Sequence, residues 1–155
     1  MHHGAGQLLV IRQGQTEWSR LGKHTGRLIV LGGARCVWDD FLELARTSDV
    51  RADLMCVNDI GMYAQKNFQH WVSQHPDHLD LWRKLLHNHA QSFAGLLHTN
   101  KPYHGPMVSW RMSDPGAYSG LFAAQVGLCL GYEQIVLCGV PQDSSGRFFD
   151  PPWVK

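Results

Sequence analysis

Long apolar runs and one-sided charge are what this sequence lacks most clearly. No stretch of the 155 residues approaches the roughly 18 consecutive apolar residues of a membrane span, and no signal-peptide core follows the first residues. Charged residues make up only 17%, and Lys and Arg are scattered, leaving a net charge of +1. We therefore expect neither a membrane span nor a nucleic-acid partner.

Paired cysteine motifs are missing as well. The four cysteines stand apart, each inside an apolar run: Cys36, Cys56, Cys129 and Cys138. A disulfide framework, a redox pair or a structural metal site is typically built from more closely patterned cysteines. We interpret these residues as buried free thiols, as expected of a cytoplasmic protein in a reducing compartment.

Short apolar runs closed by glycine or small polar residues alternate with helical patterns. The runs predict strands over residues 28–31, 53–57, 70–73, 107–110 and 134–138. Amphipathic or apolar spacing predicts a helix from Val37, a long one from an Asp77 N-cap to Leu97, and a buried one opened by Ser119. This alternation predicts an α/β single-domain fold, a mostly parallel Rossmann-like sheet of about five strands in the order 3-2-1-4-5, with helices on both faces.

Residues 1–27 precede this pattern as an N-terminal extension, and residues 28–155 form the expected Rossmann-like domain. Residues 8–11 predict a further strand, and Thr16 predicts a helix start. An ordinary crossover between parallel strands needs about a dozen residues or more, which leaves too little room before Leu28. An edge strand and an appended hairpin are both consistent with the extension.

Polar residues and glycines follow the predicted strands. Doubly wound sheets bind ligands in the crevice beyond the carboxyl ends of their strands, near the point where the strand order reverses. The residues at these ends are Gly32, Gly33 and Arg35; Asn58 and Asp59; Ser73 and His75; Ser109 and Arg111; and Gly139, Gln142 and Asp143. In a parallel sheet they would meet at one edge and form a binding site.

Each of these positions also has a purely structural interpretation. The Gly32-Gly33 pair lacks the full GxGxxG spacing, so it is either a phosphate loop or a tight turn. Asn58 and Asp59 are either ligand-binding residues or a turn, and we favour binding because Asn58 ends a buried strand. Ser119 either caps its helix or, with Gly120, holds a phosphate on the helix amides.

Metal binding has weaker support than phosphate binding. His75 and His78 are spaced like a pair of metal ligands. No third ligand stands at a recognisable offset, and a structural or catalytic metal site needs at least three protein ligands. We therefore expect no metal.

Several of these motifs together resemble a known family. They are Ile29-Val-Leu-Gly-Gly33, Cys56-Val-Asn58, Tyr118-Ser-Gly120, Leu130-Gly-Tyr132 and Ile135-Val-Leu-Cys-Gly139. Over about residues 28–143 the chain resembles bacterial sialyltransferases of the Rossmann-like type and their relatives, which include archaeal 6-hydroxymethylpterin diphosphokinases. The resemblance implies that the nucleotide of a CMP-sugar is held by Gly32 and Gly33, by Asn58, and by Ser119 with Gly120.

The chain departs from that family at two points. Its first loop reads Gly-Gly-Ala-Arg over residues 32–35, where the family has a Gly-x-Gly-Pro-Ser type of loop. The sequence also stops soon after the fifth predicted strand, where the transferases continue into a lid with tyrosines and a catalytic histidine. The resemblance therefore implies a nucleotide site more directly than transfer chemistry, and His75 and Asp143 are the candidate general bases.

A second resemblance is confined to the N-terminus. Residues 9–19 and 24–26 are similar to the opening of histidine phosphatases of the phosphoglycerate mutase family, whose Arg-His-Gly motif contains the phosphorylated histidine. Gln13 stands at the matching position. An amide cannot form a phosphohistidine, so we expect that reaction to be absent.

Together these observations predict a nucleotide or nucleotide-sugar binding protein with a CMP-like ligand, of glycosyl- or phosphoryl-transferase type. Arg35 and the helix start at Ser119 would hold phosphates, Asn58 would hold the base or ribose, and Gln142 would line the same crevice. Two alternatives are a non-catalytic binding module that kept the crevice and an inactive remnant of a histidine phosphatase. No other cofactor is expected, and the oligomeric state is left open.

Overall fold

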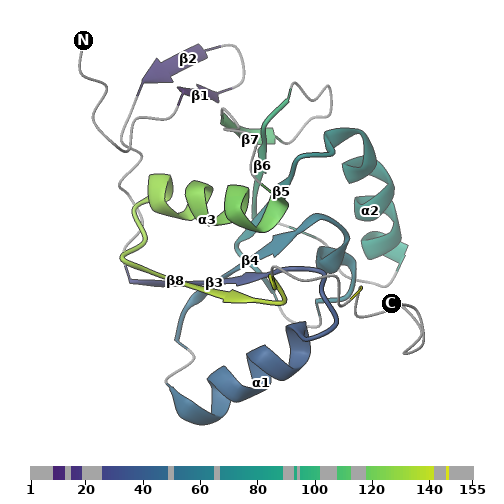
Figure 1. The fold of residues 1–155 in the computed structure, drawn as a ribbon. Helices are drawn as coiled ribbons and strands as arrows, with labels where there is room; N and C mark the ends of the chain where they lie inside the picture. Colours follow the sequence, from purple (N-terminus) through teal and green to yellow (C-terminus); the bar gives the residue numbers. More distant parts are fainter. Residues whose placement is uncertain are drawn as a thin grey trace.

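The computed structural model describes residues 9–12, 15–18, 26–48, 51–64, 67–88, 93, 95–101, 108–112, 118–141 and 146. Its strands are β1 (Leu9–Arg12), β2 (Gln15–Trp18), β3 (Arg27–Leu31), β4 (Asp53–Val57), β5 (His70–Ser73), β6 (Leu96–Thr99), β7 (Val108–Met112) and β8 (Gln134–Cys138). Its helices are α1 (Val37–Thr47), the 3-10 helix η1 (Asn58–Met62), α2 (Pro76–Asn88) and α3 (Ser119–Leu130). The predicted α/β class is confirmed (Figure 1).

All the strands belong to one sheet in the order β2-β1-β7-β6-β5-β4-β3-β8. The strands from β7 to β8 in this order run parallel, whereas β1 is antiparallel to β7 and β2 is antiparallel to β1. The prediction of a mostly parallel sheet is therefore confirmed. Among the described strands, the antiparallel pairs are β1–β2 and β1–β7, both at one end of the sheet.

The N-terminal pair corrects one prediction and decides between two others. Thr16 does not begin a helix, because it lies in β2 opposite Ile11 of β1. With Arg12 opposite Gln15, β1 and β2 form an antiparallel pair at the edge of the sheet. Of the two alternatives, the appended hairpin describes this arrangement, and its strand β1 is the one that joins the parallel strands.

The predicted strand order 3-2-1-4-5 is wrong. The strand predicted near residue 107 is β7, and it lies beyond β5 with β6 between them, rather than beside β3. The sequence pattern had hidden β6, because Leu96 and Leu97 continue the helical spacing of α2. The helix ends at Asn88, and Leu96 pairs with His70 of β5 instead.

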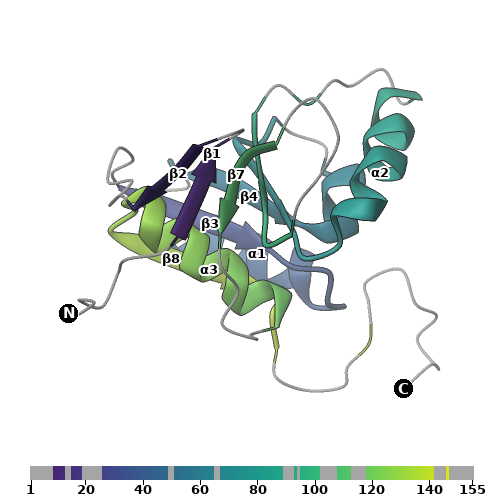
Figure 2. The same cartoon turned by 90° about the horizontal axis from the view of Figure 1, so that it is seen from above.

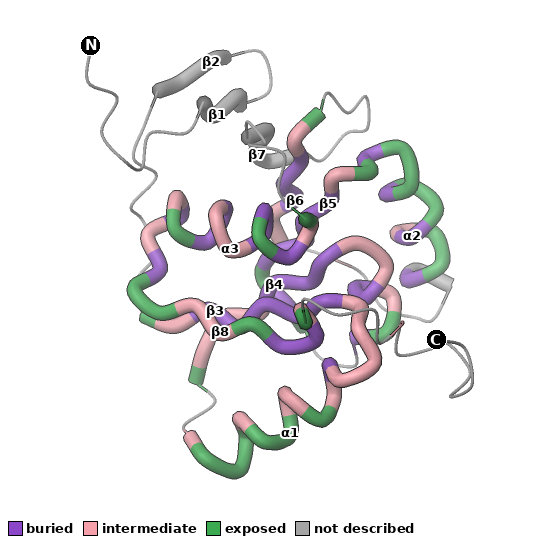
Figure 3. The backbone as a smooth tube through the Cα atoms, in the orientation of Figure 1, coloured by how far each residue is buried: buried purple, intermediate pink, exposed green. Residues whose placement is uncertain are grey.

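Helices cover both faces of the sheet, as predicted. Alternate side chains of β3 point to opposite faces, so Leu28 and Val30 pack against α3, whereas Ile29 and Leu31 pack with residues of α1, η1 and α2. The two views show α3 on the face opposite α1 (Figures 1 and 2). Buried residues follow the central strands and the inner sides of the helices (Figure 3).

Helix α3 is more apolar than α1 and α2. Its twelve residues include no charged side chain, and Phe122, Val126 and Leu130 are buried against the sheet. The helix ends at Gly131, whose φ of 101° is the left-handed conformation that glycine adopts at helix ends. The predicted buried helix is therefore confirmed. The prediction of Asp77 as the N-cap of α2 is wrong, because Asp77 lies inside the first turn of that helix.

Two further expectations concern buried free cysteines and membrane-spanning helices. All four cysteines are free thiols, as predicted, but only Cys56 and Cys138 are buried, while the other two are partly exposed. Among the helices that the structure describes, none combines the length and the hydrophobicity needed to cross a bilayer.

Candidate functional site

The carboxyl ends of the parallel strands meet at one side of the sheet, which we call the carboxyl edge. It comprises the residues that follow β3, β4, β5, β6 and β8, together with the first turn of α3. The predicted site residues at this edge are Gly32, Gly33, Arg35, Asn58, Asp59, Ser73, His75, Ser119, Gly120 and Gly139. Gln142 and Asp143 lie outside the described residues, and Ser109 and Arg111 belong to β7 itself.

Asn58 has the most unusual backbone of this edge. Its φ is 55°, the left-handed region that asparagine enters more readily than most residues, and no other non-glycine residue in the described ranges has a positive φ. Trp71 Nε1 donates to its carbonyl oxygen at 2.6 Å, and Ser73 Oγ donates to its Oδ1 at 2.9 Å. Two residues of β5 thus fix both the backbone and the side chain of Asn58.

The turn interpretation of Asn58 is partly supported and partly excluded. Asn58 begins η1, whose N-cap is Val57, and no side chain caps that helix. The Asn58 amide therefore does not serve as a helix cap, although its backbone does form the turn. Asp59 is half-buried in the first turn of the same helix.

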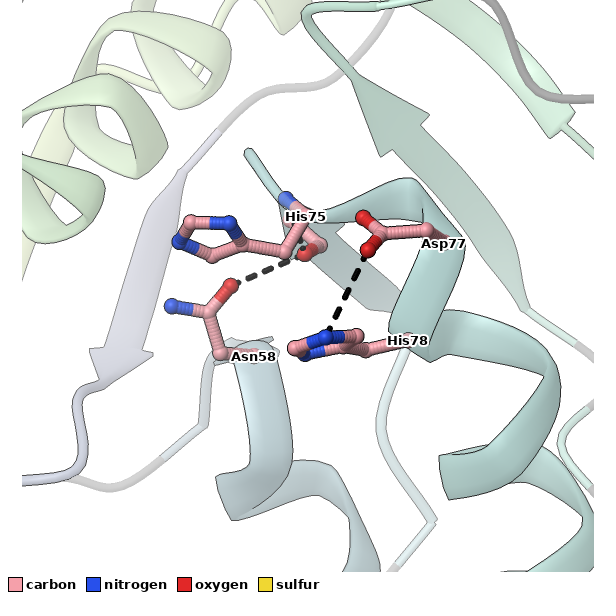
Figure 4. A network of polar contacts seen from close by, with 5 residues as sticks. Asn58, His75, Asp77 and His78 are labelled. Atoms are coloured by element: carbon pink, nitrogen blue, oxygen red, sulfur yellow. Dashed lines mark hydrogen bonds and ion pairs between the residues drawn. The ribbon is translucent and has the colours of Figure 1, made fainter.

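Two histidines lie beside Asn58 (Figure 4). The His75 backbone N–H donates to Ser73 Oγ at 2.8 Å, so the same hydroxyl binds both residues. The His75 ring stacks on the His78 ring with centroids 5.9 Å apart and an angle of 26° between the planes. His78 Nε2 is 3.4 Å from Asp77 Oδ2, and both His75 and His78 are exposed.

Ser119 joins the start of α3 to the loop after β5. Its Oγ donates to Gln74 Oε1 at 2.8 Å. The N-cap of α3 is Tyr118, which makes no side-chain capping bond, so the interpretation of Ser119 as the N-cap is wrong. The bond instead holds α3 against the segment that carries His75.

Gly32 and Gly120 are required by close packing. A Cβ atom on Gly32 would lie 2.3 Å from the Gly139 carbonyl oxygen, and one on Gly120 would lie 2.2 Å from Val140 Cγ1. At either distance, a side chain would force the neighbouring atoms to move. For Gly120, this packing gives the glycine a structural role at the start of α3.

The loop between β3 and α1 is fastened to residues that follow β8. The Arg35 backbone N–H donates to the Gly146 carbonyl at 3.0 Å, and the Ala34 N–H donates to the Gly139 carbonyl at 3.2 Å. Asp40 of α1 accepts the Gly139 N–H at 2.7 Å. Gly33 and Arg35 are half-buried in this loop, which forms the part of the carboxyl edge next to β8.

Cys138, the last residue of β8, is not a candidate nucleophile. Burial raises the pKa of its thiol to about 11, and the nearby Asp40 carboxylate and Cys36 act in the same direction. Only the thiolate attacks an electrophile, so this thiol is protonated and unreactive near neutral pH.

A second polar cluster lies at the opposite, amino-terminal side of the sheet. His98 Nε2 is 3.0 Å from His70 Nδ1, His70 Nε2 is 2.7 Å from the Tyr132 hydroxyl, and that hydroxyl donates to Asp53. Both histidines are fully buried. Burial, together with the hydrogen bond to Asp53 and its charge, raises the pKa of Tyr132 far above its ordinary value.

Sequence reasoning missed several residues that organise these two clusters. Gln74 and Asp40 were not singled out, although each accepts a bond that fixes a site segment. His70 carried a usable signal, because a histidine inside an apolar strand needs buried hydrogen-bond partners. Its partners His98 and Tyr132 come from distant segments, so no local pattern connects them.

Comparisons with known proteins match no family model, no curated protein and no solved structure. The resemblances to sialyltransferases and to histidine phosphatases therefore stay predictions, and Gln13, on which the second depends, lies outside the described residues. Within the described part of the chain, no three histidine, cysteine or acidic residues are grouped as metal ligands.

Proposed function

We propose that this protein binds a nucleotide or nucleotide sugar at the carboxyl edge of its sheet. The observation that carries the proposal is Asn58, which follows a central strand in a left-handed conformation and is held there by Ser73 and Trp71. Residues held in sparsely populated conformations by several neighbours cluster at binding and catalytic sites. Ligands of open parallel sheets bind at this same edge.

The contacts around Asn58 support a preformed site. Ser73, Gln74 and His75 are consecutive, and hydrogen bonds from this segment reach both Asn58 and Ser119. Three separate elements are thereby held in fixed relation to one another by the protein's own hydrogen bonds. Such preorganisation lowers the entropy that a binding site loses when its ligand arrives.

The proposal also includes a group-transfer reaction and a cytoplasmic location. The exposed ring of His75 lies at the carboxyl edge and is the candidate general base for a glycosyl or phosphoryl transfer. Asp143 is a candidate from the sequence alone. The four free cysteines are consistent with a cytoplasmic protein.

A thermal-shift screen tests the proposal. CMP, CDP, UDP, ATP and several nucleotide sugars would be added separately, with cytidine and uridine as unphosphorylated controls. A ligand at about 100 times its Kd stabilises the native state by about 2.7 kcal/mol, so at least one nucleotide or nucleotide sugar should raise the Tm by several degrees. A Tm that no member of the set changes contradicts the proposal. Turnover of a radiolabelled donor sugar then separates an enzyme from a binding module.

A further inference from the structure

The hydrogen bonds around Ser73 determine which way the Asn58 amide faces. Ser73 Oγ accepts the His75 N–H and donates its own proton to Asn58 Oδ1 at 2.9 Å. The amide oxygen therefore faces Ser73, and the other branch of the amide is the NH₂ group.

The Asn58 NH₂ group consequently presents donors to its surroundings. Within the described part of the chain, Nδ2 donates to no other residue, whereas Oδ1 is occupied by Ser73. The His75 ring lies beside the amide, and the His78 ring stacks on the His75 ring (Figure 4). Each ring carries at least one N–H whether it is neutral or protonated. Asn58, His75 and His78 thus form a cluster of hydrogen-bond donors, which we call the donor cluster.

We infer that the donor cluster binds a phosphoryl group of the ligand. A phosphoryl group offers only acceptor oxygens, so it complements an NH₂ group and two imidazoles, whereas a base or a ribose presents donors as well. Asp77 is the acidic residue in contact with this cluster, and its carboxylate lies 3.4 Å from His78 Nε2.

This assignment moves the phosphate away from the place that the sequence suggested. Ser119 already donates its hydroxyl proton to Gln74, and Gly120 faces Val140. Asn58, expected to hold the base or ribose, becomes a phosphate ligand instead. The inference rests on the proposed function for the identity of the whole ligand, but the phosphoryl subsite can be tested by itself.

The test replaces a donor by an acceptor without changing the shape of the side chain. Asn58→Asp keeps an oxygen for the Ser73 hydroxyl and tolerates the left-handed backbone, but its second branch is a carboxylate oxygen that repels phosphate. Gln69→Glu is the matched control. Gln69 Oε1 accepts the Leu54 N–H at 2.7 Å at the opposite side of the sheet, and glutamate keeps that acceptor while adding the same charge.

Inorganic phosphate is the first probe, titrated against chloride at constant ionic strength and followed by NMR of side-chain NH₂ and imidazole signals. We expect the Asn58, His75 and His78 signals of the native protein and of Gln69→Glu to shift together. In Asn58→Asp the affinity should fall at least about tenfold, because a charge-assisted donor is replaced by a like charge. CMP should bind the native protein more tightly than cytidine, and Asn58→Asp should abolish that preference.

Each outcome decides a separate point. Equal phosphate affinity in the native protein and Asn58→Asp, or an equal loss in both variants, overturns the phosphoryl subsite. Phosphate binding that depends on Asn58 while no nucleotide or nucleotide sugar binds supports the subsite and contradicts the proposed function. Nucleotide binding that is unchanged in Asn58→Asp supports the proposed function and contradicts the phosphoryl subsite. Circular dichroism of both variants confirms that each is folded.

Discussion

At the scale of single residues, the donation from Tyr132 to Asp53 sets the direction of the buried chain that runs from His98 to Asp53 when both histidines are neutral. The Tyr132 hydroxyl donates to Asp53, so it accepts from His70 Nε2, and His70 Nδ1 must then accept from His98 Nε2. One chain of donors therefore links β6, β5, Tyr132 in the segment between α3 and β8, and β4. Each bond pairs polar groups of this buried chain with one another.

Tyr132→Phe tests this chain. The change removes one oxygen and leaves a buried imidazole N–H facing an apolar ring, so we expect a loss of about 1–3 kcal/mol in the free energy of unfolding. Denaturant unfolding measures it. Tyr118→Phe is the control, because the Tyr118 side chain is 85% exposed, and it should change stability very little. Equal stability of the two variants would show that the chain contributes nothing.

Residue-level prediction from sequence succeeded where a local pattern fixed the position. Asn58 was singled out because it ends a buried strand, and it does lie at the carboxyl edge. The roles of Ser119 and Gly120 were not predictable, because their contacts are with Gln74 and Val140. These partners lie in other segments of the chain, so only the folded structure brings the contacts together.

At the scale of elements, α3 is held at its first turn by packing rather than by a cap. Gly120 lets the helix approach the residues after β8, and Ser119 attaches it to the segment after β5. The strand β6, in contrast, could not be recognised from its sequence. Its four residues are too short to show a period of two, so the leucines at its start continued the pattern of α2 until pairing with β5 and β7 decided their conformation.

Gly120→Ala combined with Val140→Ala tests the packing of α3. Alanine at position 120 improves helix propensity by up to about 1 kcal/mol, but its Cβ would overlap Val140, and overpacking costs about 1–3 kcal/mol. The single variant should therefore unfold more easily than the native protein. In the Val140→Ala background the same change should be neutral or stabilising. A destabilisation of the same size in both backgrounds would refute this explanation.

At the scale of the whole molecule, the parallel sheet separates two polar regions. The carboxyl edge holds the donor cluster and the loop fastened to β8, whereas the buried chain of histidines lies at the amino-terminal side. The fold class and most strands could be predicted, because apolar runs between helices specify a covered parallel sheet. The strand order could not be predicted, because β6 was not recognised and β6 is the strand that lies beside β7.

The most direct test of the account is chemical-shift mapping of the native protein with the best nucleotide from the screen. Backbone amide shifts should concentrate at the carboxyl edge, on residues such as Gly33, Asn58, His75 and Ser119. Amides at the opposite ends of the strands, such as Asp53 and Gln134, should hardly move. Shifts centred on that opposite side, or spread evenly over the sheet, would contradict a nucleotide site at the carboxyl edge.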